Sequence, residues 1–365
     1  MLPSILIIGG GVIGLSCARQ LSMNGFAVKL LDAGPRPGSE ASSAGGGILS
    51  LLYPWRHSTD LRALAQRSQE IYPYLCEELS LCTGISPQFF KSGMLITGLD
   101  HREQQIALEE PGAIVVERDD LSALEPGLVE TTGGVYSPEI ANVRNPALVK
   151  ALLLDCLRLG VEIYSDAKAT RALKLADHYH VILEDGRKFE SGHVLISAGA
   201  WSSNLLKQFD NAEQVAPVKG QIIAIKARPG VLRRTILHKG RYLIPRRDGV
   251  VLVGSTIEHA GFDKKVDSKT AKDLRNFAHA LLPNLAQYPT IAHWAGLRPA
   301  LTADAPIIEP LQNHPNVVVA TGHYRSGIVC APATAERVNK LFCGMCGEKN
   351  RQGIVKKTEI RHASA

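Results

Sequence analysis

The stretch Ile5-Leu-Ile-Ile8-Gly9-Gly-Gly11-Val-Ile-Gly14 decides the fold of this chain. Its apolar first half is typical of a buried parallel strand. The pattern Gly-x-Gly-x-x-Gly follows at once and opens an amphipathic segment, which predicts a tight turn from strand to helix. The three glycines permit the turn, let the backbone approach a pyrophosphate, and let the helix pack closely on the strand. The stretch therefore predicts a dinucleotide site at the amino end of a helix.

A second apolar segment completes the unit. It covers residues 28–31 and ends at Asp32, 18 positions after Gly14. A carboxylate at this distance is expected to accept hydrogen bonds from the ribose hydroxyls of an adenosine. The combination favours a Rossmann-type βαβ unit over a glycine-rich turn in another α/β fold. The pattern alone leaves FAD and NAD open.

Composition excludes several classes of protein. The chain has 365 residues, of which 45% are apolar and 21% charged, as in ordinary globular proteins with more than one lobe. No window offers the roughly 18 charge-free apolar residues of a membrane span, and the apolar N-terminus lacks a basic leading region. We therefore expect no membrane span and a cytoplasmic location. Half of the formal net charge of +6 lies in a basic tail, residues 347–365, which is expected to aid solubility rather than to bind nucleic acid.

The seven cysteines are scattered along the chain, which is typical of a reducing compartment rather than of a disulfide framework. Cys343-Gly-Met-Cys346 has the spacing of a zinc half-site or of a redox pair. A structural zinc needs two further ligands, and no second pair follows. No metal is therefore expected.

The order of predicted elements indicates two interleaved lobes. Helices are predicted over residues 60–85, 145–159, 268–282 and 327–343, the second with Asn145 as its N-cap and Pro146 at its first position. Strands are predicted over residues 92–97, 133–137, 161–164, 193–201, 218–227, 241–247, 250–257 and 316–322. Parallel strands precede and follow antiparallel ones, so we expect an α/β protein whose Rossmann-type lobe carries an inserted antiparallel-sheet lobe, with a ligand at the seam.

The expected lobes are discontinuous in sequence. The dinucleotide lobe is expected to comprise residues 1–85, 141–210 and 295–345. The inserted substrate lobe is expected to comprise residues 86–140 and 211–294.

Four blocks of sequence carry a resemblance to a known family. They are Gly9–Gly14 with Asp32, Ala41–Leu49, Ala295-Gly-Leu-Arg-Pro299 and Ala320–Val329, supported by Val218-Lys-Gly-Gln221 and Tyr242-Leu-Ile-Pro-Arg246. With these blocks the chain resembles the FAD-dependent D-amino-acid oxidase superfamily, and within it the glycine oxidase branch that serves thiamine biosynthesis. The likeness extends from residue 1 to about 345. It implies a glutathione-reductase-like FAD lobe.

The resemblance also implies a set of FAD contacts. The glycine turn and the end of the second strand would meet the phosphates and adenosine. The small-residue block, Ala41–Leu49, would meet the phosphates and the flavin ring. Ala169 would meet the adenine, and the block after residue 322 the reduced flavin. The full set is Gly9, Gly11, Val12, Ile13, Gly14, Asp32, Ala33, Ala41, Ser42, Ser43, Gly46, Gly47, Ile48, Ala169, His323, Tyr324, Arg325, Ser326, Gly327, Ile328 and Val329. Sarcosine oxidases tether flavin to a cysteine in the segment matching 297–304, which has none here, so we expect non-covalent FAD.

The same resemblance places Tyr242, Arg298 and Arg325 on the substrate side of the flavin, as catalytic and substrate-binding residues. A guanidinium binds a carboxylate through two parallel bonds, so Arg298 would orient an amino acid, although a structural salt bridge is the alternative from the bare sequence. A neutral amine can release a hydride to flavin N5 without a protein base. Lys219 could hold a water near N5.

These residues lead to the expectation of an oxidase for glycine, sarcosine and small D-amino acids. Its products would be an imino acid, then an oxo acid, ammonia and hydrogen peroxide, with molecular oxygen as acceptor. Relatives suggest a homotetramer. The alternatives are a dehydrogenase of the same fold that passes electrons to a quinone, a flavoprotein that modifies tRNA, and a non-catalytic FAD-binding partner protein.

Overall fold

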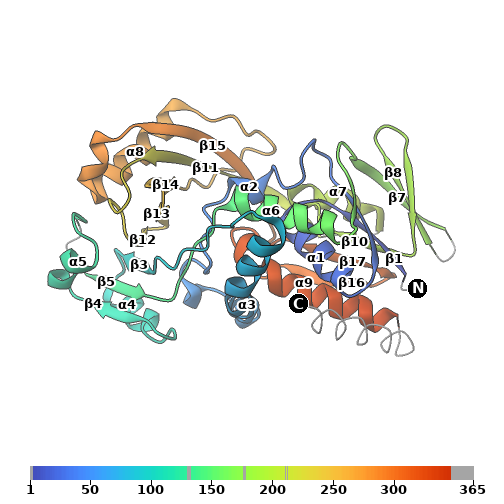
Figure 1. The fold of residues 1–365 in the computed structure, drawn as a ribbon, viewed down its shortest axis with the longest axis horizontal. Coiled ribbons are helices and arrows are strands. Elements are labelled where there is room, and N and C mark those ends of the chain that lie inside the picture. The colour runs from blue at the N-terminus through green and yellow to red at the C-terminus, as the bar shows by residue number, and fades with distance from the viewer. Residues whose placement is uncertain (1–2, 130–132, 176–177, 210, 212, 347–365) are drawn as a thin grey trace.

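The structure, a computed structural model, describes residues 3–129, 133–175, 178–209, 211 and 213–346. Figure 1 shows two bodies joined near the short helix α2 (Ala41–Ala44). One is built on a six-stranded sheet and a three-stranded sheet, and the other on an eight-stranded sheet. The basic tail expected over residues 347–365 lies outside the described residues.

The six-stranded sheet has the order β16-β17-β10-β1-β2-β6. All neighbours are parallel except β16, which runs antiparallel to β17 at the edge. The strands are β1 (Ser4–Ile8), β2 (Ala27–Leu31), β6 (Glu162–Tyr164), β10 (His193–Ile196), β16 (Ile307–Leu311) and β17 (His314–Thr321). The glycine turn leaves the carboxyl end of the central strand β1, where two neighbours also end. This is the edge at which such sheets bind ligands.

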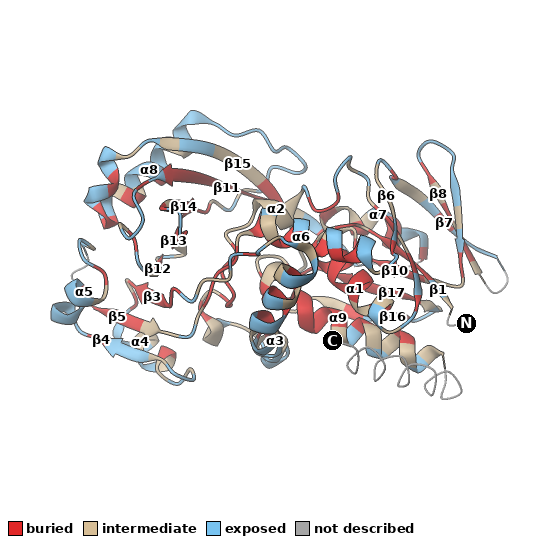
Figure 2. Ribbon diagram, in the orientation of Figure 1, coloured by how far each residue is buried: buried red, intermediate tan, exposed pale blue. Residues whose placement is uncertain are grey.

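The two faces of this sheet are covered by different elements, as the alternating side chains of β1 show. Ile5 and Ile7 face a cluster with four helices: α1 (Val12–Met23), α3 (Thr59–Thr83), α6 (Asn145–Arg158) and α9 (Gly327–Met345). Leu6 and Ile8 face a second cluster with the three-stranded sheet and α7 (Ser202–Leu206). That sheet comprises β7 (Ala169–Leu175), β8 (His178–Leu183) and β9 (Lys188–Ser191), none of which the sequence pattern predicts. Figure 2 shows buried residues concentrated in β1, β10 and the inner side of α9.

The eight-stranded sheet has the order β15-β11-β14-β13-β12-β3-β5-β4. Its pairs are antiparallel except β3 with β12, which are parallel. The strands are β3 (Met94–Thr97), β4 (Ile114–Val116), β5 (Gly134–Ser137), β11 (Ala216–Lys226), β12 (Thr235–His238), β13 (Arg241–Pro245), β14 (Val250–Gly254) and β15 (Thr290–Ala300).

Two helices cover one face of this larger sheet, and part of the other face lines the cavity. Ile223, Leu243 and Val253 pack against α8 (Ser268–Leu281) and α5 (Arg118–Leu124). On the opposite face Tyr242 and Ile244 pack with Ile48 of the small-residue block. The remaining helices are α4 (His101–Ala107) and the 3-10 turns Pro54–Arg56, Gly199–Trp201, Lys207–Phe209 and Pro283–Gln287.

Several predicted boundaries are wrong. Asn145 is not the N-cap of α6: the helix begins at Asn145 and Arg144 precedes it as the cap. The strand predicted to end at residue 201 ends at Ile196, because a 3-10 turn follows. The strand predicted to residue 257 ends at Gly254, where the chain leaves the sheet. The division into lobes stays a prediction, although β15 of the eight-stranded sheet runs across the boundary drawn at residue 295.

Two expectations concern the whole chain. Among the described residues, no helix combines the length and the apolar character that crossing a bilayer requires. All seven cysteines lie in the described part, and none of them forms a disulfide.

Candidate functional site

A cavity of about 440 Å³ lies between the two bodies. The glycine turn, Asp32 and the small-residue block line one part of it. Tyr242, Arg298 and the block after residue 320 line another part. The four blocks that carry the family resemblance, which lie far apart along the chain, therefore meet at one cavity.

The glycine turn has no room for side chains. Gly9 has φ +109°, and a Cβ on Gly14 would lie 1.9 Å from the carbonyl oxygen of Gly9. At the start of α1 the Ser42 hydroxyl accepts a hydrogen bond of 2.8 Å from the Val12 amide. The turn thus presents bare backbone, the positive end of a helix and one hydroxyl to the cavity, a combination that suits phosphates.

Asp32 holds the turn as well as facing the cavity. Its two carboxylate oxygens accept hydrogen bonds from the amides of Gly10 at 2.8 Å and Gly34 at 2.9 Å. Burial raises the pKa of Asp32, and the two amide bonds oppose that rise. A carboxylate has about four lone-pair sites, so it retains acceptors for ribose hydroxyls.

Two residues that were not expected at the site hold the small-residue block. The guanidinium of Arg246 donates to the carbonyl oxygens of Gly46 and Val143, both at 2.8 Å. The amide of Asn145 donates to the carbonyl of Ser42 at 2.9 Å. Burial lowers the pKa of Arg246 to about 9. The role of Arg246 could not be predicted from the sequence, because every residue has a backbone carbonyl and the sequence does not show which ones accept its hydrogen bonds.

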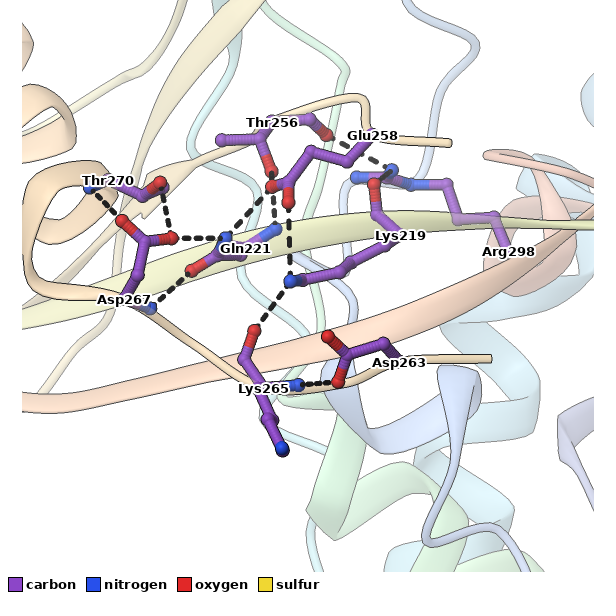
Figure 3. A network of polar contacts seen from close by, with 9 residues as sticks. All are labelled: Lys219, Gln221, Thr256, Glu258, Asp263, Lys265, Asp267, Thr270 and Arg298. Carbon is purple, nitrogen blue, oxygen red and sulfur yellow. Dashed lines mark hydrogen bonds and ion pairs between the residues drawn. The ribbon is translucent and has the colours of Figure 1, made fainter. Parts of the chain in front are cut away.

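Arg298 reaches the cavity from β15 and makes three hydrogen bonds, drawn in part in Figure 3. It donates to the Ser255 hydroxyl at 2.7 Å and to the carbonyl oxygens of Thr256 at 3.1 Å and Lys219 at 3.3 Å. Burial lowers its pKa, as expected for a cation withdrawn from water. No carboxylate of the described residues pairs with it. The structural salt bridge considered for Arg298 is therefore absent from the described part of the chain.

Gly220 on the neighbouring strand makes the space for this guanidinium. A Cβ on Gly220 would lie 2.0 Å from Nη2 of Arg298. The planar cation thus lies flat on the bare backbone of the neighbouring strand in the same sheet.

A polar network fixes the segment that supplies two of these partners. The segment, residues 255–267, follows β14 and is bound to β11 in Figure 3. The Lys219 ammonium lies 3.2 Å from the Glu258 carboxylate and donates to the carbonyl of Lys265. Gln221 donates to Glu258 at 2.9 Å and to Asp267 at 3.1 Å. Lys219 is not among the residues that line the cavity, and its expected contact with a water near N5 stays a prediction.

Three further predicted residues line the cavity: Tyr242, Arg325 and His323. Arg325 donates weakly to the carbonyl of Gly240 at 3.4 Å. Burial lowers the pKa of His323 to about 3, and its Nε2 lies 3.0 Å from the Thr334 hydroxyl.

Four members of the predicted FAD set do not line the cavity: Gly14, Ser43, Ser326 and Val329. Gly14 acts instead through helix-on-strand packing, Ser43 donates to the carbonyl of Gly38, and Val329 packs in a small apolar cluster. Five further lining residues were not predicted from the sequence: Ser197, Ala198, Gly199, Trp201 and Asn204. The glycine turn after the predicted strand at 193 was the available signal.

Comparisons with known proteins decide the family. A family model described as FAD dependent oxidoreductase (DAO) matches residues 4–341. The chain belongs to this family. Its expected resemblance, α/β fold and FAD cofactor are thereby confirmed.

Relatives of this DAO family member include glycine oxidases. The glycine oxidase of Pseudomonas aeruginosa is 38% identical over 94% of this chain and 96% of its own length. The bifunctional protein ThiO/ThiG of a Nostoc species is 30% identical over 94% of this chain and 53% of its own length. The crystal structure of glycine oxidase from Geobacillus kaustophilus matches with a TM-score of 0.88 at 27% identity and covers 94% of this chain and 95% of that one.

The described residues fit FAD. A Cβ on Gly47 would lie 2.1 Å from the Val143 carbonyl, so the lining backbone must stay bare and can approach a large planar ligand. The turn at Gly9–Gly14 would hold the pyrophosphate, Asp32 the ribose, and Gly46 and Gly47 the ring.

Proposed function

We propose that this FAD-dependent amino-acid oxidase acts on glycine and other small amino acids, such as sarcosine and small D-amino acids. For a primary amino acid such as glycine the proposed products are an imino acid, which hydrolyses to an oxo acid and ammonia, and hydrogen peroxide from molecular oxygen. The observation that carries the proposal is Arg298, a half-buried cation that lines the cavity and whose partners are two carbonyls and a hydroxyl. A charge partly withdrawn from water is stabilised by an anion of complementary shape, and a carboxylate fits.

FAD supplies the acceptor for the hydride that leaves the carbon next to the amine. The protein's task is orientation. Arg298 would fix both the position and the rotation of the substrate carboxylate, because two parallel hydrogen bonds define a plane. Tyr242 lies on the face of the eight-stranded sheet that lines the cavity. Its side chain would contact a small substrate on the side away from Arg298. A neutral amine needs no protein base, and none is assigned.

A link to thiamine biosynthesis is part of the proposal. It is supported by the similarity to the ThiO/ThiG proteins, of which this chain spans about half the length. A homotetramer, molecular oxygen rather than a quinone as acceptor, and the absence of nucleic-acid substrates stay predictions.

The test is steady-state kinetics of Arg298→Ala and Arg298→Lys with glycine and with a primary amine that lacks a carboxylate, measured as peroxide release. We expect Arg298→Ala to lose about 2–5 kcal/mol of transition-state binding for glycine, because the carboxylate loses its partner. The amine should lose far less. Arg298→Lys should restore only part of the glycine rate, since an ammonium cannot form the two-bond geometry.

The exposed Arg275→Ala of α8 serves as the control and should match the wild type. Equal losses on both substrates would assign Arg298 a structural role and overturn the amino-acid proposal. Reduction of the flavin by glycine without oxygen consumption would instead favour a dehydrogenase.

A further inference from the structure

The outer face of the β7-β8-β9 sheet carries a cluster that the oxidase chemistry does not use. His178 and His180 lie two positions apart on β8, so both point to the same face. Glu190 of β9 stands directly opposite His180 in the antiparallel register. Their ligand atoms all lie within 4.8 Å of one another. None of the three lines the cavity, and Figure 1 places β7 and β8 at the edge of the molecule away from the eight-stranded sheet.

The inner face of the same strand explains why this cluster is held firmly. Tyr179, Val181 and Leu183 alternate with the histidines and are buried in the core behind the six-stranded sheet. A one-residue slip of β8 would expose all three, so the register is strongly specified. The two imidazoles and the carboxylate are therefore presented by a fixed backbone.

The contacts between the three side chains converge on one atom. Nε2 of His180 lies 3.1 Å from Nε2 of His178 and 2.9 Å from a carboxylate oxygen of Glu190. A ring nitrogen of a neutral imidazole carries either one proton or one lone pair. A single proton on Nε2 of His180 can point along only one of the two contacts. A cation between the three atoms would receive a lone pair from each.

We propose that His178, His180 and Glu190 form a binding site for a divalent transition metal such as Zn²⁺. Two imidazoles and a carboxylate are ligands that Zn²⁺ and Cu²⁺ accept, and the remaining positions would be filled by water because the face is open. Ligands about 2.0–2.1 Å from a metal are separated from one another by roughly 3.0–3.4 Å. Of the two separations given above, 3.1 Å lies in that range and 2.9 Å lies just below it. The metal would join β8 to β9 on the face opposite the core.

The experiment is calorimetric titration of Zn²⁺ into the FAD-loaded full-length protein, produced without a histidine tag. All proteins carry Cys343→Ser and Cys346→Ser, which removes the thiol pair as a competing site. We expect one Zn²⁺ per chain, lost in the double variant His178→Ala, His180→Ala. Glu190→Gln, which keeps the shape of the side chain, should weaken binding by at least roughly tenfold. His101→Ala, an exposed histidine of α4, should bind as the parent does.

Absence of Zn²⁺ binding by the parent protein, or unchanged binding by the double variant, overturns the proposal. Flavin absorbance of each variant reports whether it has folded. If the double variant does not load FAD, Cu²⁺ bound to the parent is observed by electron paramagnetic resonance. Coupling to two imidazole nitrogens supports the site, and coupling to fewer than two overturns it.

Discussion

At the scale of single residues, the position of Arg298 depends on the absence of a side chain at Gly220. Arg298 can lie flat on β11 because Gly220 has no side chain, and its contacts are oxygens without formal charge. The guanidinium therefore keeps its charge for a ligand. A methyl group at position 220 would compete with the guanidinium for the same space.

We expect Gly220→Ala to lower peroxide formation from glycine by roughly 100-fold, the effect of misplacing a binding group by about 1 Å. Flavin content should stay normal, because Gly220 acts on the arginine. The matched control is Gly192→Ala, where an added Cβ meets no atom within 4 Å. If the Gly220→Ala variant oxidised glycine at the wild-type rate, the position of the Arg298 guanidinium on β11 would not matter for the reaction.

At the scale of elements, the small-residue block is held by hydrogen bonds from a residue of the eight-stranded-sheet body. Arg246, in the chain just after β13, binds the carbonyls of Gly46 and Val143, and so joins the eight-stranded sheet to the loop that would meet the flavin ring. Removing its guanidinium would leave buried carbonyl oxygens without donors, which costs about 1–3 kcal/mol for each group.

Arg246→Met should therefore lower both the melting temperature and the FAD occupancy of the purified protein. Methionine keeps much of the apolar volume, so the loss reports on the hydrogen bonds. The adjacent Arg247 is exposed, and Arg247→Met is the control that should melt and bind FAD normally. Normal FAD occupancy in Arg246→Met would contradict the role of Arg246 in holding the small-residue block.

At the scale of the whole molecule, a buried neutral histidine couples stability to pH. The pKa of His323 is lowered by burial to about 3, so the native state does not take up this proton at moderate acidity. The unfolded chain takes it up below a pKa of about 6.5. The contribution to stability is therefore complete above that value and falls as the pH falls toward 3.

For the wild type we expect this one group to lower the free energy of unfolding by about 2 kcal/mol between pH 7 and pH 5. His323→Asn should lack that part of the decline, and the exposed His101→Asn should retain it. Denaturant titrations at several pH values measure the difference. Parallel pH profiles of wild type and His323→Asn would contradict the assignment.

The mode of flavin attachment is also a property of the whole protein. We expect acid precipitation to release all yellow colour into the supernatant, because residues 297–304 contain no cysteine for a covalent link. Flavin that stays with the pellet would contradict this prediction.

The predictable parts of this structure are those with local or repeated signals. The βαβ unit follows from its glycines and apolar runs, and the order of elements predicted a second, inserted sheet. The sheet β7-β8-β9 was missed, although the alternation of buried Tyr179, Val181 and Leu183 with outward residues in β8 was an available signal. The partners of Arg298 were beyond reach, since carbonyl oxygens have no sequence identity. The ion pair of Lys219 could not be predicted either, because its partner Glu258 lies 39 positions away.

The strand order β16-β17-β10-β1-β2-β6 has a consequence for protein synthesis. The first strand to leave the ribosome, β1, finds β2 within the next residues, but its other neighbour, β10, begins only at His193. The outer pair β16 and β17 and the covering helix α9 come from the last described 40 or so residues, 307–345. Until these emerge, the nascent chain carries an unpaired strand edge and an uncovered apolar face, the features that chaperones bind. Ribosome-bound chains halted before residue 307 should therefore associate with chaperones, and chains halted well past residue 345 should not.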